Sequence, residues 1–350
     1  MALRIVQWTT GNVGRPSLRA IAWHPVLELV GCYAWSAEKV GRDAGELADL
    51  EPLGVVATDD VESLIALAPD CVSYNPMWTN TDELVRFLEA GINVVSTAGF
   101  ITGHALPPGE RARIEAACSQ GGASMFGTGV NPGMANLLAL VSAGICDRIE
   151  KISVLESADT TGYDSPETEL PVGFGQPLTN PALPEMARQG TAVFRDAVEM
   201  MAAALHLEID DVTCEAEFAA ATQNLELGAM RIPMGTVAGI EVHWQGRVRD
   251  QVVIDLGVRW RKGRHLEPDW SLDHGYRVEI EGRPRVKTKL EIAPPKDFEP
   301  KSFADFMLLG MIVTAMPAVN AIPAVCAAAP GIRTYADLPL ITGAGMVRPT

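Results

Sequence analysis

Residues 3–14 constrain the fold of this chain more than any other stretch. A short apolar run, Leu3 to Trp8, breaks into Thr9-Thr10-Gly11-Asn12-Val13-Gly14, and an amphipathic segment follows with Pro16 in its first turn. A strand, a glycine turn and a helix in this order are typical of the start of a dinucleotide-binding domain. Thr9 stands where the usual G-x-G-x-x-G fingerprint begins with glycine, and a glycine turn of this kind is often only a turn. The alternating strand and helix pattern that follows favours the nucleotide interpretation.

This turn and the end of the next strand predict how a dinucleotide would be held. The helix N-terminus would bind a pyrophosphate through its N–H groups, and Gly11 would let the backbone approach it. The second predicted strand, residues 27–34, leads into Trp35-Ser36-Ala37-Glu38-Lys39, without the acid at the strand end that favours NAD. Ser36 and Lys39 therefore predict a 2′-phosphate site and NADP as cofactor. NAD stays the alternative, because Lys39 is otherwise a solvated charge and Glu38 would oppose a phosphate. The residues predicted to bind the cofactor here are Thr9, Thr10, Gly11, Asn12, Val13, Ser36 and Lys39.

Short apolar strands alternate with helices over the first 130 residues, which predicts a parallel, doubly wound α/β sheet of the Rossmann type. Ligands of such sheets lie at the carboxyl ends of the strands. Asn75 and Thr97 stand at two of these ends, and Asn131 follows the last strand. We therefore expect Asn75, Thr97 and Asn131 near a nicotinamide. Asn131 is also expected to cap a helix that begins with Pro132 and includes residues 134–146.

The second half of the chain has a different pattern. Ile240, Val242 and Trp244 alternate with polar residues, and the apolar residues of 252–260 recur at every second position. A period of two with polar partners predicts an antiparallel sheet that is covered on one face. The apolar side of 252–260 exceeds what one amphipathic helix covers, so we expect a homodimer built through this region.

Composition excludes some classes of protein. The formal net charge is −16 and no cluster of basic residues offsets it, which argues against a nucleic-acid surface. The six cysteines have no paired spacing, so reduced thiols are expected rather than disulfides or metal ligands. The N-terminus has no signal sequence, so the expected location is cytoplasmic. Residues 308–329 are apolar for the length of a membrane span, but Pro317 and Pro323 favour a buried helix that breaks there.

Four motifs carry a resemblance to a known family. They are residues 7–14, 38–45, 127–133 and 318–323. With these motifs the chain resembles the dihydrodipicolinate-reductase-like oxidoreductases, in the branch of 2,4-diaminopentanoate dehydrogenase and the NAD(P)H-dependent amine dehydrogenases. The resemblance implies a Rossmann domain at 1–133, an α+β substrate and dimerisation domain with a mixed sheet at 134–306, and a segment at 307–350 that returns to the Rossmann domain. It also implies reduction of a C=N or C=O bond by a nicotinamide hydride.

The chain departs from this family at one position. The amine dehydrogenases carry a catalytic glutamate just after the strand that corresponds to 93–96, whereas residues 96–104 contain no acid here. His104 lies in this glycine-rich loop, and Tyr163 falls where the related enzymes place active-site aromatics. Tyr163 and His104 are therefore the candidate proton donors, each with a structural role as the alternative. Glu156 and Asp159 are weaker candidates that surface charge also explains.

Three functions remain open at this point. The first is an NAD(P)H-dependent oxidoreductase that acts on a small or medium apolar carbonyl or imine. The second is an amine dehydrogenase that uses a different acid. The third is a nucleotide-binding sensor that has lost catalysis. A positioned acid contributes about 10²- to 10⁴-fold to a rate, so loss of the family glutamate requires a replacement in either enzyme.

Overall fold

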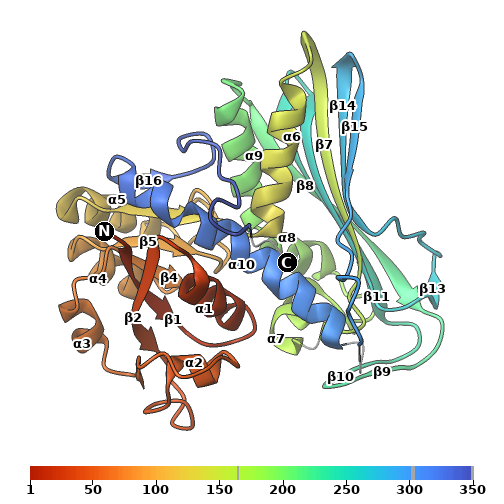
Figure 1. Cartoon of the computed structure of the whole chain (residues 1–350). Coiled ribbons are helices and arrows are strands. Elements are labelled where there is room, and N and C mark those ends of the chain that lie inside the picture. Colours follow the sequence, from red (N-terminus) through yellow and green to blue (C-terminus); the bar gives the residue numbers. More distant parts are fainter. Residues whose placement is uncertain (164, 301–303, 348–350) are drawn as a thin grey trace. The chain divides into compact units, whose positions relative to one another are not determined.

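The computed structural model describes residues 1–163, 165–300 and 304–347 (Figure 1). The chain folds into two compact units. The first, called the Rossmann unit, comprises residues 1–134 and 310–350, and the second, called the sheet unit, comprises residues 135–309.

The Rossmann unit is built on a parallel sheet of seven strands in the order β16-β6-β5-β4-β1-β2-β3. The strands are β1 (Leu3–Trp8), β2 (Leu27–Tyr33), β3 (Ala57–Thr58), β4 (Cys71–Tyr74), β5 (Asn93–Ser96), β6 (Ser124–Gly127) and β16 (Gly331–Arg333). Strand β16 comes from the C-terminal part of the chain and pairs with β6. The predicted doubly wound parallel sheet is confirmed.

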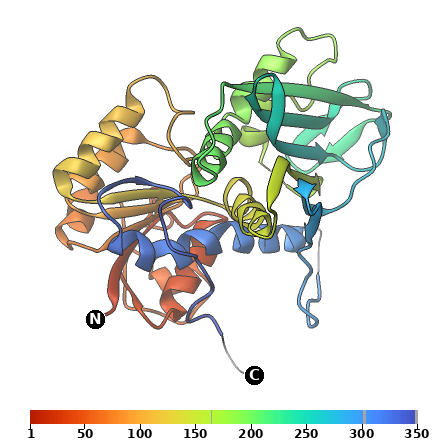
Figure 2. The same ribbon diagram turned by 90° about the horizontal axis from the view of Figure 1, so that it is seen from above.

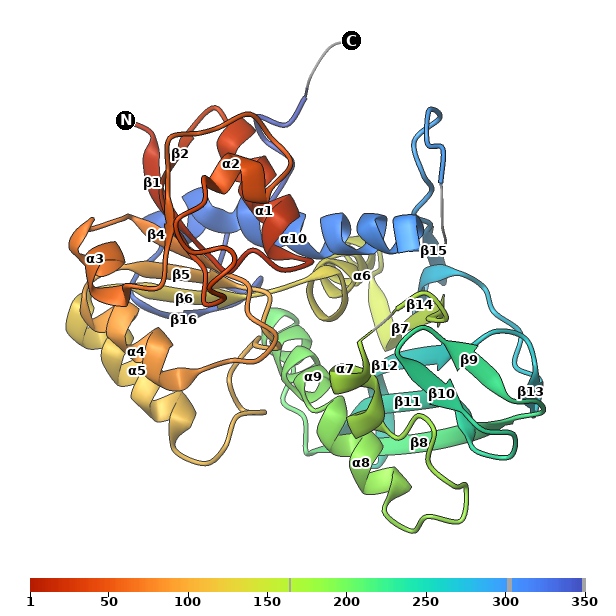
Figure 3. The same cartoon turned by 90° about the horizontal axis from the view of Figure 1, so that it is seen from below.

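Helices cover both faces of this sheet. They are α1 (Gly14–Trp23), α2 (Ala44–Leu47), α3 (Val61–Ala66), α4 (Thr81–Glu89), α5 (Glu110–Gly121) and α10 (Ala304–Ala327). Phe87 of α4 and Ile114 of α5 are buried in one core cluster, and Leu18 of α1 in a second one with Leu47 of α2. Figure 3 shows α4 and α5 along one face and α1 along the other, and Figure 2 gives the same arrangement from the opposite side.

Helix α10 corrects one expectation. It runs through Pro317 and Pro323 as one helix, whereas a break was expected there. By length and composition it is apolar enough to cross a membrane, and 39% of its most apolar stretch is buried within the protein. A core helix of a soluble protein passes the same test, and Ala318, Val319 and Ile322 are fully buried. Small and branched apolar residues on one side therefore pack within the Rossmann unit.

The sheet unit holds a mixed sheet of seven strands in the order β13-β8-β11-β12-β7-β14-β15. Only β12 and β7 pair in parallel among these described strands, and the other pairs are antiparallel. The strands are β7 (Arg148–Asp159), β8 (Asp211–Ala221), β11 (Val237–Val248), β12 (Gln251–Arg261), β13 (Leu266–Glu267), β14 (Gly275–Arg283) and β15 (Val286–Leu290), and β9 (Leu225–Leu227) pairs with β10 (Met230–Ile232). The expected mixed, largely antiparallel sheet is confirmed.

The helices of this unit cover the apolar face of the sheet. They are α6 (Ala135–Ala143), α7 (Pro166–Glu169), α8 (Leu183–Gly190) and α9 (Val193–Ala204). Helix α6 packs on β7 and β14, and α9 packs on β11 and β12 (Figure 1). Ile254, Leu256 and Val258 are at most 2% exposed as a result. The apolar side of β12 is therefore covered by several helices rather than by one, and the expected homodimer stays a prediction.

Candidate active site

The β1–α1 turn adopts the fingerprint geometry without its first glycine. Thr9 has a φ of +71°, in the left-handed region that a β-branched residue rarely adopts. The Thr9 hydroxyl donates a hydrogen bond to the Asn75 carbonyl at 2.9 Å, which holds this conformation. A Cβ added at Gly14 would clash with the Thr9 carbonyl oxygen, so only glycine fits there. Thr9, Gly11 and Gly14 therefore occupy the three glycine positions of the fingerprint.

The residues of this turn fit a pyrophosphate. No side chain among the described residues caps the N-terminus of α1, where Val13 is the cap residue. Gly11 is exposed, and a Cβ built on it would meet no atom within 4 Å. The Thr10 hydroxyl is buried and has no hydrogen-bond partner within the part of the chain that the structure describes. The backbone N–H groups at the N-terminus of α1 and the buried Thr10 hydroxyl are hydrogen-bond donors that suit a phosphate group, and the exposed Gly11 lets the phosphate approach them.

A buried network links the ends of three strands. The Gln7 side chain is fully buried, and its Nε2 donates to the Asn75 Oδ1 at 2.8 Å and to the Thr9 carbonyl at 2.9 Å. The Asn75 Nδ2 donates to the Thr97 hydroxyl at 2.9 Å. Asn75 and Thr97 are thus brought together, as their strand-end positions predicted. Gln7 was missed by sequence reasoning, although an amide among the apolar residues at the end of β1 is a signal that could have found it.

The segment after β6 differs from its prediction. Asn131 and Pro132 have extended backbone, their peptide bond is cis, and Gly133 has a φ of +139°. Helix α6 begins only at Ala135. The expected helix cap at Asn131 is therefore wrong, because Asn131, Pro132 and Gly133 have non-helical backbone and precede the start of the helix. The turn is fastened from the C-terminal segment, where the Tyr335 hydroxyl lies 2.9 Å from the Thr128 hydroxyl and burial raises the pKa of Tyr335 to about 12.

The loop after β2 brings a cation to the β1–α1 turn. The Lys39 N–H donates to the Ser36 carbonyl at 2.9 Å, and the Lys39 ammonium donates to the Thr10 carbonyl at 3.4 Å. The Ser36 hydroxyl is buried without a hydrogen-bond partner among the described residues, and Glu38 is exposed. Lys39 is half-buried in a turn and lies beside the β1–α1 turn, rather than on the exposed face of a helix.

The two candidate proton donors lie in different units. His104 is exposed in the loop after β5, with its Nδ1 3.4 Å from the Thr102 hydroxyl. Tyr163 is half-buried in the turn after β7, and its N–H donates to the Thr160 carbonyl at 2.9 Å.

The two nearby acids have structural partners. The Trp260 indole donates to the Glu156 carboxylate at 2.8 Å. The Asp159 carboxylate accepts from the Thr161 N–H at 3.0 Å and from the Gly263 N–H at 3.2 Å. Glu156 and Asp159 therefore hold strand ends and turns in place through these hydrogen bonds.

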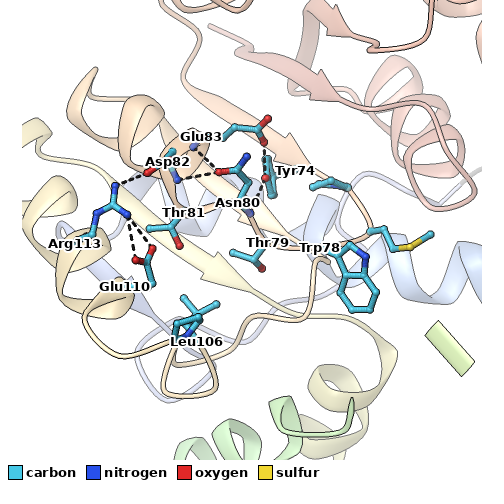
Figure 4. A pocket seen from close by; sticks show the side chains of 13 residues that line it. Tyr74, Trp78, Thr79, Asn80, Thr81, Asp82, Glu83, Leu106, Glu110 and Arg113 are labelled. Atoms are coloured by element: carbon cyan, nitrogen blue, oxygen red, sulfur yellow. Dashed lines mark hydrogen bonds and ion pairs between the residues drawn. The ribbon is translucent and has the colours of Figure 1, made fainter. Parts of the chain in front are cut away.

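A cavity of about 680 Å³ lies in the Rossmann unit between the N-terminal ends of α4 and α5, and Tyr74 and Pro76, the neighbours of Asn75 in the chain, line it. Its charged groups satisfy one another: the Tyr74 hydroxyl donates to Glu83 at 2.6 Å, and Arg113 pairs with Glu110 at 3.0 Å and with Asp82 (Figure 4). None of the predicted site residues lines it. Among the described residues no group of three or more His, Cys, Asp or Glu side chains could hold a metal ion, and six cysteines are free thiols.

Comparison with known proteins identifies the family. Residues 134–347 match the 2,4-diaminopentanoate dehydrogenase C-terminal domain. The chain is 34% identical to an amine dehydrogenase of Streptomyces virginiae over 96% of both chains. It is 23% identical to the 2,4-diaminopentanoate dehydrogenase of Acetoanaerobium sticklandii, over 81% of this chain and 76% of that one.

A solved structure shows the same fold. The amine dehydrogenase from Mycobacterium smegmatis matches with a TM-score of 0.79 at 21% identity, over 99% of this chain and 98% of that one. The resemblance drawn from the sequence motifs is thereby confirmed. The chain belongs to the family of 2,4-diaminopentanoate dehydrogenase and the amine dehydrogenases, and it is an oxidoreductase that uses a nicotinamide cofactor.

Proposed function

We propose that this oxidoreductase uses NADPH to reduce a small or medium apolar carbonyl or imine, with the Tyr163 hydroxyl as proton donor. The observation that carries the proposal is the pair of buried hydroxyls, Thr10 and Ser36, that lack hydrogen-bond partners among the described residues. The Lys39 ammonium donates to the Thr10 carbonyl, and its N–H donates to the Ser36 carbonyl. A buried hydroxyl without a partner is costly unless a ligand supplies one. Both hydroxyls belong to the two segments proposed here to bind the phosphates of a dinucleotide, which supports the proposal.

The roles proposed for the cofactor residues follow from these positions. Thr9 to Val13 would hold the pyrophosphate at the N-terminus of α1, and Ser36 and Lys39 would hold the 2′-phosphate that distinguishes NADPH from NADH. Asn75, Thr97 and Asn131 would form the nicotinamide end of the site. The amide of Asn75 is already bonded to Gln7 and Thr97, so its contribution is to fix the shape of that end rather than to donate freely.

The chemistry that a bound reduced nicotinamide supplies is a hydride for the substrate carbon. The protein must then protonate the oxygen or nitrogen of the same double bond. Residues 96–104 offer no carboxylic acid for this step, and Tyr163 can donate its phenolic proton and regain one from solvent. His104 is the alternative donor.

Tyr163→Phe tests the proton donor, since it removes only the hydroxyl and keeps the ring. The expected result is a fall in kcat of at least about tenfold, the low end of what a positioned acid contributes. The NADPH Kd should stay unchanged, because the cofactor residues are in the Rossmann unit. His104→Gln is the matched variant. A normal kcat for Tyr163→Phe combined with a slow His104→Gln enzyme would move the role to His104.

A second function, reductive amination, is favoured by the 34% identity to an amine dehydrogenase over nearly the whole chain. The two functions differ in their need for ammonia. NADPH oxidation with apolar ketones that proceeds at full rate without ammonia supports the carbonyl reductase. Turnover that appears only when ammonia is added supports the amine dehydrogenase, with Tyr163 in place of the family glutamate.

We also propose that the enzyme is a cytoplasmic homodimer, and that the subunits meet on the face of the sheet that carries the charged side chains of β11 and β12. There His243 bridges Glu241 at 3.1 Å and Asp255 at 2.7 Å, and Arg259 pairs with Glu241 at 2.6 Å. The two carboxylates are only 11–12% exposed, which supports a face built for close packing. A species of 37.5 kDa in sedimentation at micromolar concentration would contradict the dimer.

A further inference from the structure

Lys262 is a fully buried cation directly after β12. Its ammonium pairs with Glu169 of α7, itself 5% exposed, and donates to the Thr160 carbonyl at 2.6 Å and to the Tyr163 carbonyl at 3.4 Å. It also lies 5.3 Å from the centre of the buried Phe174 ring. One cation therefore fastens the turn that bears Tyr163, helix α7 and the segment after it.

Burial of this pair is not a general device for stability. The loss of water by an ammonium and a carboxylate opposes burial, and apolar residues of similar volume often serve a core as well or better. The ammonium instead fixes the orientation of a single turn, because it donates hydrogen bonds to two backbone carbonyls of that turn. The Tyr163 N–H closes the same turn on the Thr160 carbonyl at 2.9 Å. The backbone of Tyr163 is thus held at both its N–H and its carbonyl.

We propose that Lys262 is a positioning residue, which holds the Tyr163 turn so that the phenol is presented to the substrate in one orientation. The proposal rests on the role proposed above for Tyr163. Proton transfer depends steeply on the placement of the donor, so a turn that is free to shift loses rate although the donor is still present. Glu169 completes the charge of the buried site and keeps the ammonium in place.

The test is a double-mutant cycle on the full-length enzyme. Lys262→Met with Glu169→Gln removes both charges at similar volume, and this pair of changes is combined with Tyr163→Phe. If Lys262 acts through Tyr163, the pair lowers kcat by at least about tenfold but costs little more in the Tyr163→Phe background. The NADPH Kd stays unchanged in all variants. A purely structural role would lower the melting temperature and leave kcat of the folded enzyme as it was.

Arg4→Met is the matched control. Arg4 also holds two loop carbonyls, those of Leu67 at 2.6 Å and Ala68 at 3.0 Å, but at the amino-terminal end of β1, away from the proposed site. It should lower stability and keep kcat. If the charge-removing pair fails to fold, Gly263→Ala strains the turn after β12, which is hydrogen-bonded to Asp159 beside the Tyr163 turn, without touching a buried charge. Gly263 has a φ of +74°, and its N–H donates to Asp159.

The outcomes separate this inference from the proposed function. A slow Tyr163→Phe enzyme together with a normal kcat for the Lys262 and Glu169 variant overturns the positioning role alone. Losses that multiply in the combined variant overturn it as well, because they show independent action. A normal kcat for the Tyr163→Phe enzyme overturns the assignment of Tyr163 as proton donor.

Discussion

Replacing Gly11 with alanine separates the fold of the β1–α1 turn from its capacity to bind a cofactor. A Cβ at Gly11 meets no atom within 4 Å, and the residue is not among those with positive φ. The substitution is therefore free of strain, and the smaller entropy of the unfolded chain should raise the free energy of unfolding by about 0.4–1 kcal/mol. The same methyl group fills the space where a pyrophosphate must approach the backbone. We expect the NADPH Kd to rise at least tenfold, or about 1.4 kcal/mol.

Thermal and denaturant unfolding with and without NADPH measure both effects on one protein. At a concentration of about 100 times the wild-type Kd, NADPH should add about 2.7 kcal/mol to the free energy of unfolding. A tenfold weaker complex leaves about 1.4 kcal/mol of this at the same concentration. Gly14→Ala is the control, because its Cβ clashes with the Thr9 carbonyl and should destabilise the protein without ligand. Wild-type stabilisation of Gly11→Ala by NADPH would refute the pyrophosphate assignment.

Three further perturbations test other parts of the site. Lys39→Glu should weaken NADPH by about 1.5–3 kcal/mol, as expected for loss of a charged hydrogen bond, and barely affect NADH; equal losses in titrations of both cofactors would remove the 2′-phosphate role. Gln7→Leu leaves the Asn75 Oδ1 and the Thr9 carbonyl without this donor, so urea unfolding should show a loss of about 1–3 kcal/mol, and an unchanged midpoint would contradict the network. Asp255 and then Glu241 raise the pKa of His243 to about 9 from 6.5. Its contribution, at most about 3 kcal/mol, is therefore complete below pH 6.5 and lost as the pH rises through about 9; His243→Gln should flatten that part of the stability profile.

The fold followed from local patterns because local pattern and tertiary environment agree there. Short apolar runs between helices predicted the parallel sheet. The alternation of apolar and polar residues around Val242 predicted a half-covered antiparallel sheet, and Val242 is fully buried in that sheet. Strand ends gave Asn75 and Thr97, since the carboxyl ends of parallel strands share one edge. These predictions needed no knowledge of distant contacts.

The remaining features depend on interactions between residues far apart in the chain. The amide of Gln7 finds its partner 68 positions away, and the Lys262 ammonium pairs with a carboxylate 93 positions away. The backbone propensity of threonine argues against a left-handed conformation at Thr9. That conformation is held by the hydrogen bond from the Thr9 hydroxyl to the Asn75 carbonyl, a contact that sequence does not show. Asn131 followed by Pro132 is the local pattern of a helix start. The backbone of the surrounding turn is extended at both residues, so that local pattern does not decide the conformation.

Transfer of deuterium from NADPH labelled at the nicotinamide C4 tests the central claim most directly. The purified enzyme is supplied with this cofactor and a panel of apolar ketones and aldehydes, with and without ammonia, and the products are analysed by mass spectrometry. We predict label on the former carbonyl carbon of an alcohol product, formed without ammonia. Label in an amine formed only with ammonia would instead identify reductive amination. Tight NADPH binding without label in any product would contradict catalysis at this site.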